Sequence, residues 1–512
     1  MKMTFFMQKK IKRAIHKDKK QIVAGVLILA LLSVAVAFVS CGTPFLQKVA
    51  KEVTNYKMNL EYIAEEKSIS GTCSVDFFNN LDVVVEQIPF HLHPNAYRED
   101  ATLKPVGLAD QAFAFPHGKS FGDIKIQNVK NGITNLKNKI CGDDQNILLV
   151  DLGQKVYPDS RFEVEITFTT KLANINHRLG YGDNTINLCN FFPIVCAMKN
   201  NTFVQHPYNS NGDPFFSEVS NYDVSISYPS SLALASTGTS TTTQFNSIKT
   251  SNITGKSVRD FAIIISSNFE IATQNYNGIQ VSYYGNGKMP ATKMLNIAVD
   301  AVKDFEFMFG KYPYPSLAVV NADFCHGGME YPMLVMISSS INDVSTYEMV
   351  IVHEIAHQWW YGVVGNDQFN HGWLDEGLAE YSTALFYKDK NKTITYEQLI
   401  ANATNNYTTF VKAYKNVLEK VDTSIDRPID KFKTSQEYVN MAYVKSMLMF
   451  ESLHNLIGDK KFFKTLKIYY NENAFKISSP EILMATFKNE TRTDLDTFFD
   501  SWINGKVEIL AT

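Results

Sequence analysis

The chain has 512 residues, of which 45% are hydrophobic and 20% charged, values typical of a globular protein of about three domains. Its 12% aromatic content excludes global disorder, and its 26 Gly and 6 Cys exclude collagen-like and disulfide-scaffold proteins. The net charge of -3 is uneven: the first 20 residues carry eight basic side chains and one acidic one, which leaves -10 on the rest. Because the body is acidic, we predict no nucleic-acid partner.

Residues 22–40 are an uncharged apolar stretch of 19 residues. A helix of this length is about 28 Å long, close to the thickness of the hydrocarbon core of a bilayer. The basic residues precede it, so we predict a cytoplasmic tail (1–21), a transmembrane anchor (22–40), a linker (41–53) and an extracellular body, as in a single-pass protein of the cell membrane. One alternative stays open, in which the residues before Cys41 form a bacterial lipoprotein cleavage box and a lipid on Cys41 anchors the chain.

The remaining cysteines form an odd and scattered set, which is not a disulfide framework. Cys189 and Cys196 either bridge locally or remain two buried free thiols. No CxxC pair is present, so we do not expect zinc bound by cysteines. We expect Cys325, together with His326, only to pack near a cleft.

From residue 54 to residue 270 the hydrophobic pattern has a period of two. In the segment 162–168 Phe, Val and Ile alternate with Glu and Thr, and the segment 222–228 repeats this alternation before Pro229. Such alternation is typical of half-buried strands. We predict an all-β, sandwich-like N-terminal domain over 54–270, serving as a platform or substrate wall.

After Pro290 the pattern becomes helical. We predict helices over 291–310, 345–363, 376–387, 395–420, 436–457, 459–472, 480–488 and 493–503. Two β segments, 317–320 and 333–338, lie between the first two helices. Strands followed by helices indicate a multidomain α+β protein, whose second domain, 271–512, is mostly helical.

The residues expected to carry chemistry begin with His353-Glu354-Ile355-Ala356-His357, an HExxH motif in a helix. Residues four apart share a helix face, so both imidazoles can reach one ion while Glu354 points into the same cleft. Zinc sites of this kind add a third protein ligand and keep a position for water. Glu376, separated from His357 by eighteen residues, supplies that ligand, and we predict one Zn²⁺ per chain.

Four motifs resemble the aminopeptidase N family of gluzincin metallopeptidases. They are HEIAHQWW (353–360), GWLDEGLAEY (372–381), GGMEY (327–331) and MAYVK (441–445). The β half is also similar to that family's N-terminal domain. The resemblance covers roughly residues 55–505 and implies a saddle-like β domain packed on a thermolysin-like (zincin) catalytic domain.

The resemblance also implies roles for individual residues. The zinc ligands are His353, His357 and Glu376, the general base is Glu354, the group that stabilises the oxyanion is Tyr443, and the substrate-binding residues are Gly328, Met329 and Glu330, of which Glu330 binds the α-amine. Glu380 either orients a ligand imidazole or faces solvent. Strand 333–338 is expected to hold the peptide backbone by edge pairing.

The chain departs from the family pattern at three positions. Tyr331 replaces the usual Asn after Glu330, Asp375 replaces the Asn before the Glu ligand, and Ser446 replaces the Gly after Tyr-x-Lys. The last change leaves Tyr438 as a competitor for the role of Tyr443.

The predicted function is that of a zinc aminopeptidase, which hydrolyses N-terminal residues from extracellular peptides with a free N-terminus. Two alternatives remain open. In the first, the chain is a zinc endopeptidase whose cleavage does not depend on a free N-terminal amine. In the second, it is a non-catalytic surface protein that uses a zincin-like scaffold for binding.

Overall fold

The computed structural model describes residues 52–388, 390, 394–417, 421–507 and 509. They belong to the second of two compact units, Met1–Lys51 and Glu52–Thr512. The predicted tail (1–21), the predicted anchor (22–40) and Cys41 lie outside the described residues.

The predicted membrane localisation is corrected. Among the described residues, no helix is both long enough and apolar enough to cross a bilayer. The two longest helices, α4 (Ala291–Phe309) and α8 (Tyr396–Val417), bury only part of their surface and carry charged side chains. Since the segment 22–40 is not described, neither a membrane anchor nor an extracellular location enters the function proposed for the chain.

The N-terminal half consists of strands, as predicted. They are β1 (Thr54–Ile63), β2 (Ser68–Phe78), β3 (Val85–His91), β4 (Asp123–Asn131), β5 (Thr134–Asn135), β6 (Asn138–Cys141), β7 (Ile147–Val156), β8 (Arg161–Lys171), β9 (Leu179–Tyr181), β10 (Ile186–Cys189), β11 (Ile194–Val195), β12 (Met198–Lys199), β13 (Thr202–Phe203), β14 (Ser220–Pro229), β15 (Ala233–Ser236), β16 (Thr239–Phe245), β17 (Ile248–Val258) and β18 (Ala262–Ser266). The predicted alternation is confirmed in β8 and, from Tyr222 onward, in β14, where every second side chain is buried.

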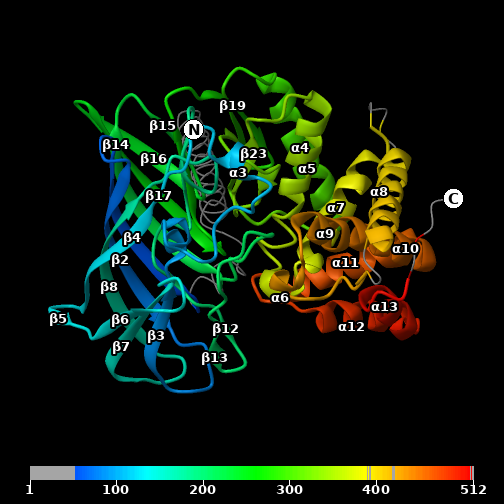
Figure 1. Ribbon diagram of the computed structural model, residues 1–512, viewed down its shortest axis with the longest axis horizontal. Helices are drawn as coiled ribbons and strands as arrows, with labels where there is room; N and C mark the ends of the chain where they lie inside the picture. Colours follow the sequence, from blue (N-terminus) through cyan, green and yellow to red (C-terminus); the bar gives the residue numbers. More distant parts are fainter. Residues whose placement is uncertain (1–51, 389, 391–393, 418–420, 508, 510–512) are drawn as a thin grey trace, which may run out of the picture. The chain divides into compact units, whose positions relative to one another are not determined.

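The largest sheet has eight strands in the order β16-β17-β14-β1-β2-β8-β4-β5. Its only parallel pair among the described strands is β1 with β14. Two four-stranded sheets, β15-β18-β10-β9 and β11-β3-β7-β6, complete the β half together with the β12–β13 hairpin. In Figure 1 these strands and helices α7 to α13 occupy opposite sides of the unit.

A five-stranded sheet opens the second half. Its strands are β19 (Glu270–Tyr276), β20 (Ile279–Gly285), β21 (Ser316–Ala322), β22 (Gly328–Met329) and β23 (Leu334–Ser338), in the order β19-β20-β21-β23-β22. The strand predicted at 333–338 was expected to be an edge, and this is wrong: β23 pairs with β21 on one side and β22 on the other. The free edge next to it is β22, a two-residue strand that the sequence pattern did not reveal.

The helices follow the predicted order. They are α4, α5 (Val344–Ala356), α6 (Gln368–His371), α7 (Trp373–Tyr387), α8, α9 (Ser435–Tyr438), a π-helical segment (Val439–Lys445), α10 (Ser446–Ile457), α11 (Asp459–Asn473), α12 (Pro480–Thr491) and α13 (Asp496–Ile503). Short helical turns also occur at His93–Tyr97, α3 (Gln111–Ala114) and Ile429–Lys431. The helix predicted over 345–363 ends earlier, at Ala356, because the chain turns back on itself and Tyr361 adopts a positive φ of 123°.

Buried polar contacts join the two halves. Arg259, which is 1% exposed, donates hydrogen bonds to the carbonyls of Ser217 (2.8 Å), Tyr361 (2.9 Å) and Lys476 (3.1 Å). The division at residue 270 between a β domain and a peptidase domain stays a prediction. Cys189 and Cys196 are buried free thiols.

Candidate active site

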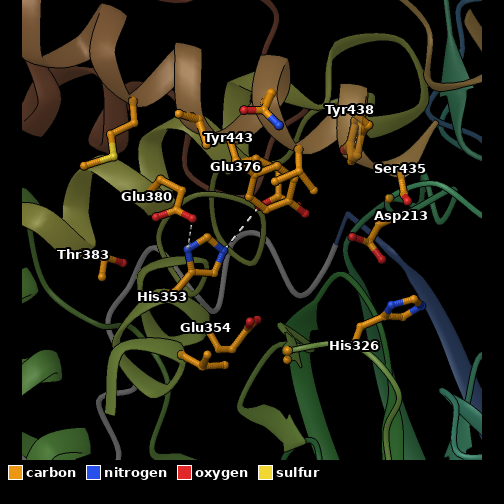
Figure 2. A pocket seen from close by; sticks show the side chains of 18 of the residues that line it. Asp213, His326, His353, Glu354, Glu376, Glu380, Thr383, Ser435, Tyr438 and Tyr443 are labelled. Carbon is orange, nitrogen blue, oxygen red and sulfur yellow. Dashed lines mark hydrogen bonds and ion pairs between the residues drawn. The ribbon is translucent and has the colours of Figure 1, made fainter. Parts of the chain in front are cut away.

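A cavity of about 870 Å³ lies between loops of the β half and the helices. Its walls come from the loops around Arg178 and Asp213, from strand β22, and from α5, α7, α8 and the π-helical segment. Figure 2 shows His353 and Glu376 on one side of it, with Asp213 and His326 facing them from the other side. The cavity is therefore built by both halves of the chain.

Helix α5 positions the HExxH motif. The Asp343 carboxylate caps its N-terminus by accepting a hydrogen bond from the Thr346 backbone at 2.7 Å. The helix is almost wholly buried at its C-terminal end, where His353 and His357 lie one turn apart. This spacing places both imidazoles toward the cavity, as the sequence predicted.

The three predicted metal ligands converge on one point. The Nε2 atoms of His353 and His357 are 3.1 Å apart, and Glu376 Oε2 lies 3.4 Å and 3.2 Å from them, respectively. Ligand atoms of a tetrahedral zinc ion are separated by about 3.3 Å, because Zn–N and Zn–O distances are about 2.0–2.1 Å. The two nitrogens and one carboxylate oxygen therefore fit a zinc ion without rearrangement.

The hydrogen bonding of His357 selects the tautomer that a metal needs. Its Nδ1 lies 2.9 Å from the Trp360 carbonyl oxygen, which can only accept, so Nδ1 carries the proton. When the ring is neutral, Nε2 presents its lone pair to the cavity. His353 Nδ1 lies 3.9 Å from a carboxylate oxygen of Glu380, whose side chain lines the cavity and is 34% exposed, so the role of Glu380 stays a prediction.

Glu376 lies in the first turn of α7. Burial alone would raise its pKa, but the neighbouring imidazoles of His357 and His353 lower the pKa of Glu376 to about 2. The carboxylate is thus held ionised, the form that binds metal. The adjacent Asp375 accepts a hydrogen bond from Asn366 at 3.0 Å, and burial with the nearby Glu376 raises the pKa of Asp375 to about 8.

Glu354 is 5% exposed and lies beside the ligands. Its carboxylate, that of Glu330 and the His357 ring each offer an atom within 4.8 Å of the others. Burial raises the pKa of Glu354 to about 7, although both motif histidines act in the opposite direction. A carboxylate with a pKa near neutrality is suited to accept and return a proton.

Glycine is required next to Glu354. A Cβ built on Gly328 would lie 2.3 Å from Glu354 Oε1 and 2.6 Å from its Cγ. Strand β22 therefore approaches the carboxylate more closely than any side chain would allow.

Glu330 follows β22 and is 3% exposed. Its Oε1 is buried without a hydrogen-bond partner among the described residues. Burial, with the nearby Asp213 carboxylate, raises the pKa of Glu330 well above its usual range. A buried carboxylate oxygen without a partner costs free energy unless a ligand pairs with it.

The other residues of the GGMEY motif differ in position. Gly328 lines the cavity, but Met329 is buried outside it and its sulfur accepts a hydrogen bond from Arg178 Nε at 3.3 Å. Tyr331 also points away from the cavity, since its hydroxyl donates to Asn190 Oδ1 at 2.9 Å in the β half. The Asn-to-Tyr departure therefore does not place a phenol at the amine end of the site.

Two tyrosines reach the cavity from the far wall. Tyr443 belongs to the π-helical segment, a feature often found at functional sites, and its hydroxyl donates to Glu376 Oε1 at 2.5 Å. The Tyr438 hydroxyl instead packs closely against Gly212 and Gly372. A Cβ atom built on either glycine would lie 2.6 Å from this hydroxyl. Of the two phenols, the one paired with a candidate ligand is Tyr443, and its role stays a prediction.

Sequence reasoning missed the charged pair Arg178–Asp213 on the β side of the cavity. The two side chains form a buried ion pair, and the Arg178 guanidinium also stacks over the Phe215 ring with its carbon 5.2 Å from the ring centre. Neither residue stands in a motif or in a periodic segment, so no signal in the sequence pointed to them.

Comparison with known proteins gives the chain a family. Residues 294–502 match the profile of the peptidase family M1 domain. Residues 294–502 belong to peptidase family M1, and the predicted resemblance of the chain to the aminopeptidase N family is confirmed. This M1 chain thereby carries a metallopeptidase domain, as its motifs predicted.

Curated relatives of the M1 chain include three aminopeptidases. It is 26% identical to aminopeptidase M1-B of Oryza sativa subsp. japonica over 47% of its own length and 29% of the relative's. It is 28% identical to aminopeptidase B of Mus musculus (46% and 35%) and 26% identical to aminopeptidase N of Lactococcus lactis subsp. lactis (41% and 26%). The matched region thus spans about a third or less of these relatives.

Among solved structures, an M1 zinc metallopeptidase of Deinococcus radiodurans is similar over most of both chains. The TM-score is 0.62 at 17% identity, with 89% of this chain and 95% of that one covered. A mutant of that peptidase bound to a Tyr-Ser-Ala substrate gives 0.62 at 16% identity, with 90% and 96% covered. This similarity confirms the predicted fold of the M1 chain, a β domain followed by a mostly helical zincin domain.

Proposed function

We propose that the chain is a zinc-dependent aminopeptidase that hydrolyses the N-terminal residue from peptides. The observation that carries this proposal is the carboxylate of Glu330, which is buried beside Glu354 and His357 and has one oxygen without a partner among the described residues. A peptide ammonium is the complementary group, because a charge-assisted hydrogen bond compensates the burial of both charges. The aminopeptidases among its relatives support the same assignment.

In this proposal His353, His357 and Glu376 hold one Zn²⁺. The ion supplies Lewis acidity, which polarises a carbonyl and lowers the pKa of a bound water. The remaining work falls on the chain's own side chains.

Glu354 would accept the proton of the attacking water and return it to the leaving amine. Tyr443 would donate its hydroxyl hydrogen to the oxygen on which negative charge develops, after exchanging its bond to Glu376 for one to the substrate. Glu330 would fix the α-ammonium and so set which peptide bond lies beside Glu354.

Strand β22 is suited to hold the peptide backbone. It is the edge of the five-stranded sheet, and Gly328 leaves its cavity side without a side chain. An extended peptide can add to such an edge by main-chain hydrogen bonds.

We further propose that 54–270 and 271–512 act as separate domains, the first closing the cavity and the second carrying the ligands.

The test replaces Glu330 with Gln in the full-length protein and compares free and N-acetylated peptides. Loss of a charge-assisted hydrogen bond costs about 1.5–3 kcal/mol, so kcat/KM should fall roughly 10–150-fold on free peptides. Zinc content should not change, because Glu330 lies outside the ligand set. Asp110→Asn, which removes a carboxylate elsewhere on the cavity wall, is the matched control and should keep the preference for free amines.

The two competing functions give different results in this assay. An endopeptidase would cleave free and acetylated peptides alike before and after the change at Glu330. A non-catalytic zincin-like protein would cleave neither peptide, even with one zinc ion bound per chain.

A further inference from the structure

A second group of metal-binding side chains lies on the β side of the cavity. His177 is in the loop between β8 and β9, and Cys325 and His326 are in the loop between β21 and β22. One donor atom from each lies within 4.8 Å of the other two. None of the three belongs to the His353, His357 and Glu376 set.

His177 is the most constrained member of this cluster. It is fully buried, and its Nδ1 lies 2.6 Å from the Tyr97 hydroxyl. Its Nε2 is buried and has no hydrogen-bond partner among the described residues. When Nδ1–H donates to the tyrosine oxygen, Nε2 presents a lone pair toward the cluster, the arrangement found in metal-bound histidines.

The backbone fixes the two loops against each other. The Cys325 amide donates to the Asn176 carbonyl at 3.0 Å. The side chain of Asn187 donates to the His177 carbonyl at 2.8 Å and to the Asp323 carbonyl at 2.9 Å. Residues from two loops about 150 positions apart are therefore held together by three hydrogen bonds, independently of the cluster's side chains.

The cluster is reachable by an ion from solution. Cys325 and His326 are half-buried, and His326 lines the cavity, on the same side as Asp213 in Figure 2. The nearby charges are those of Asp110, whose carboxylate acts on Cys325 and His326, and of Arg178, which is paired with Asp213. The carboxylates of Asp110 and Asp213 and the guanidinium of Arg178 together carry one net negative charge beside the cluster.

We propose that His177, Cys325 and His326 form a second zinc site, distinct from the one formed by His353, His357 and Glu376. Two imidazole nitrogens and a thiolate are a donor set for Zn²⁺ and for related thiophilic ions. Zinc would replace the thiol proton of Cys325, which is released to solvent, and a water would complete the tetrahedron. Ligand atoms of such a site lie about 3.3–3.7 Å apart, a spacing that is compatible with donor atoms that all lie within 4.8 Å of one another.

Cobalt distinguishes this site from the catalytic one. Co²⁺ replaces Zn²⁺ in tetrahedral sites, and a thiolate ligand adds a charge-transfer absorption in the near ultraviolet. The set of His353, His357 and Glu376 contains no sulfur, so the absorption reports only the second site. The full-length protein is dialysed against Zn²⁺ or Co²⁺, and the metal content and spectrum are measured.

The wild type should bind two ions per chain and show the thiolate absorption. Cys325→Ser and, as a second variant at a half-buried position, His326→Ala should each bind one ion and lack the absorption. Cys141→Ser, which alters a half-buried cysteine outside the cluster, should retain both ions and the absorption.

The proposal is overturned if the wild type binds one ion per chain, or if Cys325→Ser keeps two ions and the absorption. It does not depend on the proposed peptidase function. Glu376→Ala should lose the other ion while the thiolate absorption remains, so failure of the catalytic site and failure of this site give different results.

Discussion

The contact between Gly328 and Glu354 gives the sharpest prediction about Glu354, the proposed general base. In Gly328→Ala the new methyl carbon would lie 2.3 Å from Glu354 Oε1 and 2.6 Å from both Cδ and Cγ. Rotating the carboxylate alone cannot relieve a clash that includes Cγ, and the side chain is buried, so the whole side chain of Glu354 must retreat. Ordinary contacts begin at 3.4 Å, so the retreat is about 1 Å.

A misplacement of about 1 Å can reduce the rate by about 10²-fold, and complete loss of a general base costs about 10²–10⁴-fold. We therefore expect the kcat of Gly328→Ala on a free aminoacyl substrate to fall about 100-fold, or about 2.7 kcal/mol in activation free energy. Zinc content should remain at the wild-type value, because the ligand atoms are not touched.

The neighbouring glycine provides the control. A Cβ on Gly327 would meet only Val350 Cγ2, at 3.9 Å, which is an ordinary contact. Gly327→Ala should keep near-normal kcat in the same assay. Equal losses in the two variants, or full activity in Gly328→Ala, would refute the role given to the position of Glu354.

Four further changes test the site and the fold. Glu354→Gln should keep its zinc and lose about 10²–10⁴-fold in kcat, because Gln cannot accept a proton, and metal analysis beside the assay checks both. Glu376→Ala removes one of the three proposed ligands and should lower the affinity for zinc, which equilibrium dialysis measures. Arg259→Met leaves three carbonyls without their donor and should lower the free energy of unfolding by about 3–5 kcal/mol in urea titrations. Burial would raise the pKa of Asp367, but hydrogen bonds from His206 and Asn370 hold this pKa well below its usual range. The ionised Asp367 therefore stabilises the folded state above the unfolded pKa of about 3.9, and this stabilisation is lost as the pH falls from there toward the lower folded pKa. The stability difference between wild type and Asp367→Asn should accordingly be largest at neutral pH and shrink in acid.

The convergence of His353, His357 and Glu376 could be predicted because it depends on a short stretch of sequence. Residues at i and i+4 share a helix face whatever the fold, and eighteen intervening residues suffice for a turn and a returning helix that brings Glu376 back. The strands of the β half could be predicted for the same reason, since alternation at 162–168 is a property of the segment itself.

Features that depend on distant segments could not be predicted. The Arg178–Asp213 pair and the His177–Cys325–His326 cluster arise where loops meet, and loops carry no periodicity that reveals their partners. The position of β22 was missed because two residues are too few to show a pattern, so the edge was assigned to its neighbour β23. The apolar character of 22–40 is a property of composition, and no described helix supports the location inferred from it.

Because β22 is short, it limits how many peptide residues the site can bind by main-chain pairing. A strand of two residues offers hydrogen bonds to only one or two residues of an extended chain, so nothing on this edge registers how much peptide lies beyond them. In the proposed function, main-chain pairing on this edge would therefore fix only the residues next to the peptide N-terminus.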